Sequence, residues 1–294
     1  MMKKIKNFIK DSWLFLLIFL LGFIITIYPF ISQAYYRFDS KDEIVNFTKE
    51  SQKIDKEEVN RRIKLAKAYN STLDSSLIKD PFTEEEKKEG LNEYARMLEI
   101  EELIGHVEIP KISEDIPIYA GTSDDVLEKG VGHLEGTSLP VGGQATHTVL
   151  TAHRGLVDKK LFRNLDKLTY GDIFYIHNIK ETLAYKVDQI KVIEPTNFDD
   201  LLISGKGDYA TLLTCTPYMI NSHRLIVRGE RIPYTSAIDD GKANPPGFYP
   251  DWLELLLLTL PIILILLYSR FRIYKTSKKL RKQVEYLEEK AKEH

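Results

Sequence analysis

Two apolar segments near the ends of the chain constrain its fold most, because each is long enough to hold the chain in a membrane. They cover residues 13–31 and 252–268 and stand out from an otherwise polar sequence. A membrane-crossing helix needs roughly 20 apolar residues, with a range of about 17 to 25. Each segment begins with a tryptophan and carries a tyrosine near its far end, as interfacial anchors do. We therefore predict two transmembrane helices.

Basic residues flank this pair of segments and predict its orientation. Cytoplasmic flanks are rich in Lys and Arg, so residues 1–12 are expected to be a cytoplasmic N-terminus and residues 269–294 a basic cytoplasmic tail. The residues between the two spans then lie outside the cell. A cleaved signal peptide is the alternative for the first segment, but no clear small-x-small cleavage site follows it.

The composition narrows the setting of this outside domain. The chain has one cysteine and therefore no internal disulfide, which is unremarkable at a bacterial surface without an oxidising periplasm. We expect a Gram-positive bacterium for that reason. The net charge of -2 gives no case for nucleic-acid binding.

The first part of the outside region, residues 32–102, is expected to be helical. A loose helical periodicity across residues 40–70 predicts one or two amphipathic helices against a core, with a solvated helical stalk as the alternative. Pro81 cannot lie inside a helix and biases Asp80 towards an extended conformation. Within residues 78–84, Asp80-Pro81-Phe82 is therefore predicted to form a turn with the ring of Phe82 at its tip.

From residue 103 the chain changes to short β-prone runs separated by glycine turns. Many short strands with such punctuation are typical of a sandwich or a closed barrel. A short helix is expected at residues 162–168, and residues 236–251 are interpreted as a linker between a domain at 103–235 and the second span. The predicted strands are residues 105–109, 116–119, 147–152, 173–177, 182–192, 208–215 and 223–227.

Cys215 is either a buried core residue or a reactive thiol, since free cysteine is often buried. A nucleophilic cysteine needs a group that protonates the leaving amine and another that stabilises the oxyanion. His147 and His153 share one strand face but lie roughly 20 Å apart at about 3.3 Å per residue, so only one can serve the thiol. We favour His153, which ends its strand. His223, the histidine nearest to Cys215 in sequence, is the alternative.

The oxyanion donor is expected to be an arginine of the strand that follows Cys215. Arg224 and Arg228 share one face of that strand, but Arg228 lies about 13 Å further along it. If the strand runs back beside the one that ends at Cys215, Arg224 lies near the sulfur. The same geometry turns His223 away from Arg224.

Several motifs together resemble one known family, the sortases. The resemblance covers about residues 103–232, is closest to the pilus-assembling class C, and implies a closed sortase β-barrel. It implies catalytic roles for His153, Cys215 and Arg224 and a substrate-binding role for Thr214. The motifs are Thr211-Leu212-Leu213-Thr214-Cys215 with the downstream Arg224, Thr151-Ala152-His153-Arg154-Gly155, Gly132-His133-Leu134-Glu135-Gly136-Thr137-Ser138, and residues 215–224.

Two further features are similar to class C sortases. The segment Asp80-Pro81-Phe82 resembles the class C lid, which implies that Asp80 contacts the catalytic arginine and that Phe82 covers the cysteine. Some members carry Trp where this chain has Phe82. The second span also fits class C, because housekeeping sortases usually have a single N-terminal one. The resemblance thus implies an autoinhibited, two-pass membrane enzyme.

The resemblance implies a cysteine transpeptidase that cleaves an LPxTG-like sorting signal through a thioacyl-enzyme. A lysine amine of another pilin would then accept the acyl group, so that pilin subunits and the membrane are the partners. One alternative is a sortase that anchors surface proteins to peptidoglycan. A second, of a different class, is a membrane-anchored structural or binding domain with an inert cysteine. We expect no metal or other cofactor, because no His/Cys ligand spacing occurs.

Overall fold

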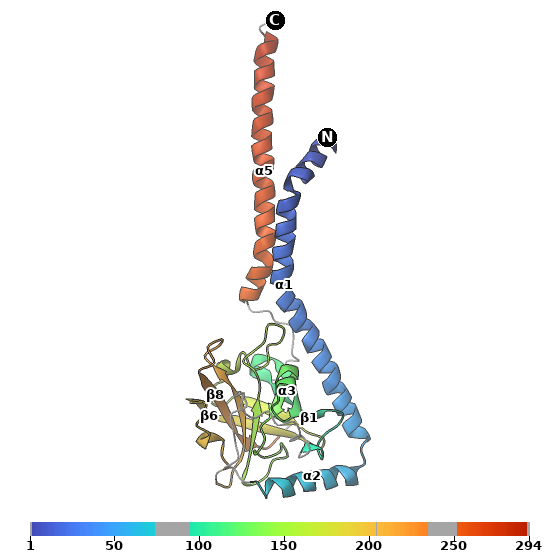
Figure 1. Cartoon of the computed structure of the whole chain (residues 1–294), viewed down its shortest axis with the longest axis vertical. Helices are drawn as coiled ribbons and strands as arrows, with labels where there is room; N and C mark the ends of the chain where they lie inside the picture. Colours follow the sequence, from blue (N-terminus) through green and yellow to red (C-terminus); the bar gives the residue numbers. More distant parts are fainter. Residues whose placement is uncertain (1, 74–94, 204, 235–251, 293–294) are drawn as a thin grey trace. The chain divides into compact units, whose positions relative to one another are not determined.

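The computed structural model describes residues 2–73, 95–203, 205–234 and 252–292 (Figure 1). The chain divides into two units, residues 1–31 with 248–294, and residues 32–247. The helices are α1 (Met2–Lys53), α2 (Lys56–Asn70), α3 (Asp124–Lys129) and α5 (Trp252–Lys292), with short 3-10 helices η4 (Pro110–Ile112), η5 (Leu165–Lys167) and η6 (Asp199–Leu201). The strands are β1 (Leu103–Ile109), β2 (Glu114–Ala120), β3 (Val131–His133), β4 (Thr146–Thr151), β5 (Ile173–His177), β6 (Thr182–Ile193), β7 (Asp208–Thr216) and β8 (His223–Ile232).

The eight strands close into a barrel in the order β1-β2-β3-β4-β7-β8-β6-β5, and β1 pairs with β5 to complete it. The pairs β2/β3 and β4/β7 are parallel, and the other six pairs are antiparallel. The prediction of a closed barrel is confirmed. Each of the seven predicted strands is present. The strand β3 was not predicted, because its three residues are too few to show a period of two.

Two apolar clusters divide the side chains of β4, β7 and β8 between the faces of the sheet. The larger cluster has members from every strand, including Leu212 on β7, and therefore fills the barrel. The smaller cluster contains Leu213 and lies on the other face, beneath Leu201 of η6. Because successive side chains of a strand alternate between faces, Leu213 and Cys215 point out of the barrel.

The helical region that precedes the barrel packs onto it. Phe47 on α1 and Ile63 and Ala66 on α2 belong to the larger cluster. The amide of Asn70 at the end of α2 pairs with both backbone groups of Leu139, accepting from its N–H at 2.8 Å and donating to its carbonyl at 3.1 Å. The prediction of amphipathic helices against a core is confirmed, and the solvated stalk is wrong.

The predicted short helix at residues 162–168 is reduced to the single turn η5. Leu161 adopts a positive φ of 45°, a conformation that does not continue a right-handed helix. The segment forms successive turns in which N–H groups donate to carbonyls three residues back, Leu165 to Phe162 at 3.1 Å and Leu168 to Leu165 at 3.2 Å. Bonds of this spacing belong to 3-10 turns rather than to an α-helix.

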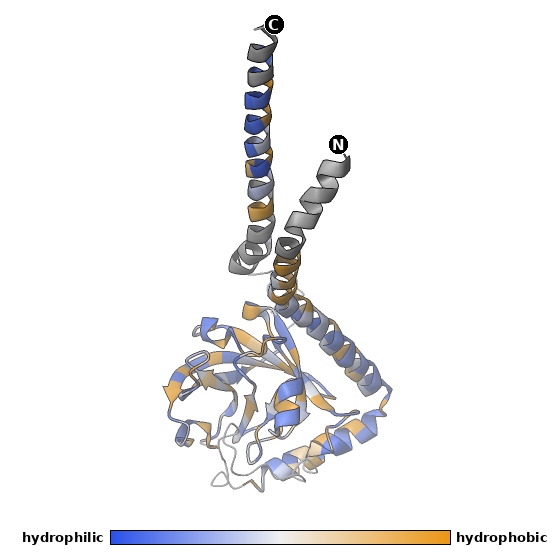
Figure 2. Ribbon diagram, turned by 45° about the horizontal axis from the view of Figure 1, so that its top comes forward, coloured by the Kyte–Doolittle hydropathy of each residue, from blue (hydrophilic) through white to orange (hydrophobic). Residues whose placement is uncertain are grey.

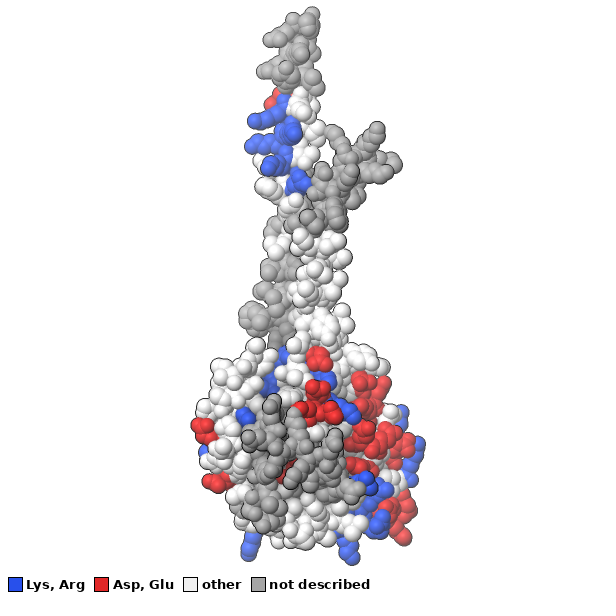
Figure 3. All heavy atoms as spheres, viewed as in Figure 1, with Lys and Arg blue, Asp and Glu red and all other residues white. Residues whose placement is uncertain are grey.

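Among the described residues, one helix is long and apolar enough to cross a membrane: α1, from Leu17 onwards. Its side chains between Leu17 and Ile31 are largely exposed, and this stretch is orange in Figure 2. The predicted second span at 252–268 lies within α5, but most of its side chains are outside the described residues, so it stays a prediction. The basic tail is visible in Figure 3 as blue side chains along α5.

Two buried histidines make the stability of the barrel depend on pH. Burial lowers the pKa of His133 and that of His147 from 6.5 to about 4. The unfolded chain then binds protons that the folded chain does not, so stability is lost as the pH falls from 6.5 towards 4. Burial also raises the pKa of Glu114 from 4.5 to about 6, and this acts in the opposite direction between those values.

We expect His133→Gln to reduce the loss of stability between pH 7 and pH 5 by about 2 kcal/mol. The amide of glutamine can still donate to the carbonyl of Ser138, as the Nε2–H of His133 does at 2.8 Å. The measurement is the thermal midpoint by near-ultraviolet circular dichroism, on the full-length protein in detergent. His223→Gln, at a half-exposed surface histidine, is the control. An unchanged pH dependence in His133→Gln would contradict the assignment.

Candidate active site

The end of β7 and the start of β8 place Cys215 and Arg224 opposite each other. The two residues are paired in the antiparallel register. Directly opposed residues point to the same face, with Cβ atoms about 4.5 to 5.5 Å apart. Each residue is only 6% exposed. The Nη1 atom of Arg224 donates to the carbonyls of Asn221 at 3.1 Å and His223 at 3.2 Å, which holds the guanidinium at the start of β8.

The end of β4 brings His153 to the same place. β4 and β7 are parallel, and their register ends with Thr151 opposite Leu213. The N–H of Ala152 donates to the carbonyl of Leu213 at 3.2 Å, which carries the alignment one residue further. The following residue, His153, then lies beside the level of Cys215. Because β4, β7 and β8 are neighbours, the three residues come from adjacent strands at one end of the barrel.

The surroundings of His153 favour its neutral form. Burial lowers the pKa of its imidazole below the ordinary value, and the carboxylate of Glu128 on α3 partly opposes this by attracting the imidazolium. Glu128 was not predicted as part of the site, because nothing in its local sequence pattern links α3 to the end of β4. Only the parallel and antiparallel pairing of β2, β3 and β4 brings these elements together.

Thr214, predicted to bind substrate, is fully buried. It lies between Leu213 and Cys215 on β7 and therefore points to the opposite face, into the barrel. Its hydroxyl donates to the carbonyl of Ala152 at 2.7 Å. In this structure Thr214 thus joins the end of β4 to β7, and its role towards substrate stays a prediction.

The alternative histidines lie elsewhere. His147 is buried, donates from Nδ1 to the carbonyl of Leu202 at 3.0 Å and accepts at Nε2 from the hydroxyl of Thr211 at 2.7 Å. His223 pairs with Thr216 rather than with Cys215, so it points to the opposite face, as expected. Its Nε2 lies 3.2 Å from a carboxylate oxygen of Glu194. Of these histidines, only His153 combines the face and the level of Cys215.

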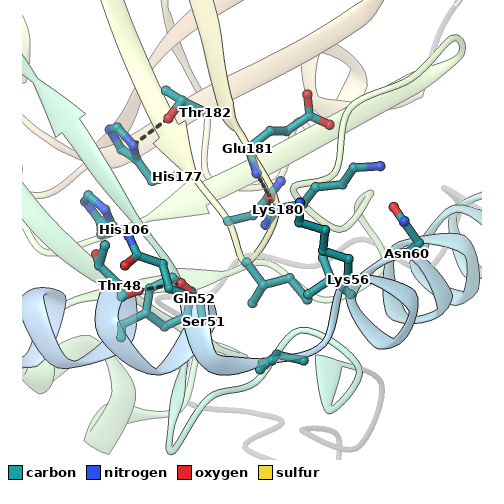
Figure 4. A pocket seen from close by; sticks show the side chains of 15 residues that line it. Thr48, Ser51, Gln52, Lys56, Asn60, His106, His177, Lys180, Glu181 and Thr182 are labelled. Atoms are coloured by element: carbon teal, nitrogen blue, oxygen red, sulfur yellow. Dashed lines mark hydrogen bonds between the residues drawn. The ribbon is translucent and has the colours of Figure 1, made fainter.

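Figure 4 shows a cavity of about 650 Å³ whose lining does not include Cys215, Arg224 or His153. Two of its lining residues, His106 and His177, stack with ring centroids 4.2 Å apart. Thr182 also lines it and begins β6, whereas the other end of β6, Ile193, pairs with Arg224. About 35 Å of strand therefore separate the cavity from the cysteine end, so the cavity is not part of that site.

Comparison with known proteins agrees with this geometry. The family model of the sortase domain matches residues 107–232. Sortase C-1 of Streptococcus pneumoniae is 60% identical, its structure aligns with a TM-score of 0.64, and the alignment covers 66% of this chain and 100% of that one. The chain belongs to the sortase family. The resemblance to class C is also confirmed, since the pilus-related sortase C of Group B Streptococcus is 56% identical, with 67% and 97% of the chains covered and a TM-score of 0.61.

Curated relatives of this sortase are more distant. Sortase D of Bacillus subtilis is 30% identical over 131 residues, which are 44% of this chain and 63% of that protein. Sortase SrtE2 of Streptomyces coelicolor is 31% identical over 163 residues, which are 49% of this chain and 60% of that protein. The chain thus spans less than two thirds of the length of either relative. The predicted lid residues Asp80 and Phe82 lie outside the described residues.

We expect Glu128→Gln to move the titration of the His153 imidazole to lower pH. The substitution removes a negative charge that stabilises the imidazolium, so the pKa of His153 falls further below its ordinary value. The measurement is NMR of histidine-labelled full-length sortase in detergent, with the resonance assigned by His153→Gln. Glu181→Gln, at the distant cavity, is the control and should leave the midpoint unchanged. A midpoint that stays constant in Glu128→Gln would contradict this electrostatic contact.

Proposed function

We propose that this sortase is a cysteine transpeptidase that joins pilin subunits into pili. The observation that carries the proposal is the pairing of Cys215 with Arg224 across β7 and β8, beside the end of β4 that carries His153. A thiol, a permanently charged donor and a titratable imidazole supply the nucleophile, the oxyanion donor and the acid or base that catalysed acyl transfer to an amine uses. The class C relatives, one of them described as pilus-related, support pilin as the substrate.

The first half of the reaction forms a thioacyl-enzyme. The Cys215 thiolate attacks the carbonyl carbon between Thr and Gly of an LPxTG-like sorting signal, and the carbonyl electrons move to the oxygen. Arg224 donates to that oxyanion, because its charge and fork of donors favour an anionic oxygen. Collapse of the intermediate breaks the C–N bond, and the imidazolium of His153 gives its proton to the departing glycine amine.

The second half transfers the acyl group to a lysine of another pilin. His153 is neutral after it has lost its proton, and its lowered pKa favours this form. The imidazole takes a proton from the neutral lysine amine as the nitrogen attacks the thioester. The C–S bond breaks, the thiolate of Cys215 leaves, and an isopeptide bond remains. The enzyme returns to its starting charge state.

The setting of the proposed reaction is the outer face of a Gram-positive cell membrane. The apolar stretch of α1 supports one anchor, and the apolar segment at 252–268 with its basic flank suggests a second with both termini in the cytoplasm. A sortase that anchors proteins to peptidoglycan would use the same first half-reaction and a different amine. A structural domain with an inert cysteine is disfavoured, because such a domain has no need of a buried arginine opposite the thiol.

The proposal includes a lid formed by Asp80 and Phe82, in which the acid contacts Arg224 and the ring covers Cys215. Its support is the similarity of Asp80-Pro81-Phe82 to the class C segment. Such a lid would keep the resting enzyme inactive until substrate or a partner shifts the population towards an open state.

We expect Cys215→Ala to abolish pilin polymerisation, with a loss of at least about 1,000-fold because no nucleophile remains. The assay combines full-length enzyme in detergent with pilin subunits and follows the ladder of covalent polymers on a denaturing gel. Adding a peptidoglycan cross-bridge amine as a competing acceptor separates the two sortase functions. Polymer formed by Cys215→Ala at the wild-type rate would refute the assignment.

The double variant Asp80→Ala with Phe82→Ala should react with a thiol reagent at Cys215 at least about tenfold faster than wild type. Without the lid side chains the open state is no longer the minor one, so the reagent reaches the thiol in most molecules. The rate of labelling is followed by mass spectrometry of the intact protein. Exposed Tyr170 supplies the control variant Tyr170→Ala, which removes an aromatic ring elsewhere on the surface. Equal labelling rates in wild type and the double variant would argue against a closing lid.

A further inference from the structure

Arg154 links the two chain segments that carry His153 and Cys215. It directly follows His153, and its Nη1 donates a hydrogen bond to the hydroxyl of Thr216, which directly follows Cys215. Its Nη2 lies 2.8 Å from a carboxylate oxygen of Asp166, just inside η5. The Arg154 side chain is only 9% exposed. One guanidinium therefore spans β4, β7 and the loop between β4 and β5.

This link lies on the opposite face from the proposed reacting groups. Side chains of successive residues alternate between faces, so Thr216 points away from the face of Cys215. The bond from Arg154 to Thr216 holds the two segments together from that side. The Thr216 end of this bond thus lies away from the Cys215 face, so the influence of the bond on the reaction passes through the position of His153.

The hydrogen-bond ladder between β4 and β7 ends just before His153 and Cys215. The last register pair is Thr151 with Leu213, and beyond it the bonds of Ala152 to Leu213 and to Thr214 are the last that align the backbones. His153 itself lies past the end of β4, in the loop to β5. The Arg154 side chain thus supplies the next connection in the place where the strand pairing has stopped.

A second arginine strengthens the same connection. Arg163, further along the loop, lies over the ring of Tyr218 at 5.8 Å from its centroid, and Tyr218 belongs to the turn between β7 and β8. The chain can turn back towards Arg163 because Gly155 adopts a φ of 106°. Residues other than glycine rarely adopt this φ, and a Cβ atom there would also lie 2.6 Å from the Arg163 Nε, which favours glycine at this position.

We propose that Arg154 is a positioning residue, which sets the distance between the imidazole of His153 and the sulfur of Cys215. The inference rests on the proposed function, because it assumes that this pair transfers the proton to the leaving amine. Proton transfer needs the groups within hydrogen-bond reach, and a misplacement of about 1 Å can lower a rate about 100-fold. A guanidinium suits this position because its separate nitrogens reach Thr216 and Asp166 at once, which one ammonium cannot do.

The first test is a double-mutant cycle of Arg154→Gln and Thr216→Val in the full-length enzyme, with kcat and KM for transfer of an LPxTG-like peptide to a lysine amine. Each single variant should lower kcat at least about tenfold with little change in KM, since substrate is not contacted. The kcat of the double variant should be no more than about twofold below that of the less active single variant, because both substitutions remove the same bond. Independent, multiplying losses would overturn the proposal.

The second test needs no turnover. The rate of alkylation of Cys215 by iodoacetamide is measured across pH for wild type, His153→Ala and Arg154→Gln. If Arg154 positions His153, the profile of Arg154→Gln should match that of His153→Ala. If the profile changes in His153→Ala but stays that of wild type in Arg154→Gln, the positioning role is overturned while the proposed function stands. If His153→Ala itself behaves as wild type, the pairing in the proposed function fails.

Two further variants separate positioning from general stability. Arg228→Gln breaks a comparable ion pair, in which Nη2 lies 2.7 Å from Asp188, but at a position about 13 Å along β8 from Arg224. It should leave kcat and the alkylation profile unchanged. Arg154→Lys keeps the charge and one bond and should restore part of kcat. A loss of kcat in Arg228→Gln equal to that in Arg154→Gln would show that any broken ion pair suffices and would overturn the proposal.

Discussion

The parallel pairing of β4 with β7 is the constraint on which the rest of the site depends. In a parallel pair, the carboxyl ends of both strands lie at the same end of the sheet. Here those ends are Thr151 and Thr216, and the next antiparallel strand, β8, starts at the same end of the barrel. Residues from three separate parts of the chain therefore meet without any long loop having to fold over them.

Apolar side chains pack on both faces of the strands that carry the site. The larger apolar cluster fills the interior, and a smaller one around Leu213 covers the outer face of the strands that carry the site. Both clusters restrict the motion of β7 just before Cys215. A buried charge is tolerated there only where hydrogen bonds replace water, and the carbonyls that accept from Arg224 and the partners of Arg154 provide them. The rigid strands thus hold these charged groups in a largely buried environment.

Much of the fold was predictable because its strands carry local signals. Seven runs of β-prone residues between glycine turns correspond to seven of the strands, and the apolar periodicity at residues 40–70 marks the helices that pack on the barrel. β3 was not predicted because three residues show no period. The turn η5 replaced a predicted helix because Leu161 takes a positive φ and the backbone bonds after it join residues three apart, which closes 3-10 turns.

The functional side chains, like the strands, were predictable only where a local sequence pattern identifies them. The sequence by itself determined that Cys215 is the sole thiol, that Arg224 and Cys215 share a face if their strands pair, and that His153 lies at the end of a β-prone run, because alternation and the ends of such runs are local properties of a chain. Only the tertiary structure decided that β4 runs parallel to β7, that Glu128 lies close enough to act on His153, and that Arg154 bonds to Thr216. These contacts join residues that are distant in sequence. They depend on the order of the strands around the closed barrel, and no local sequence pattern encodes that order.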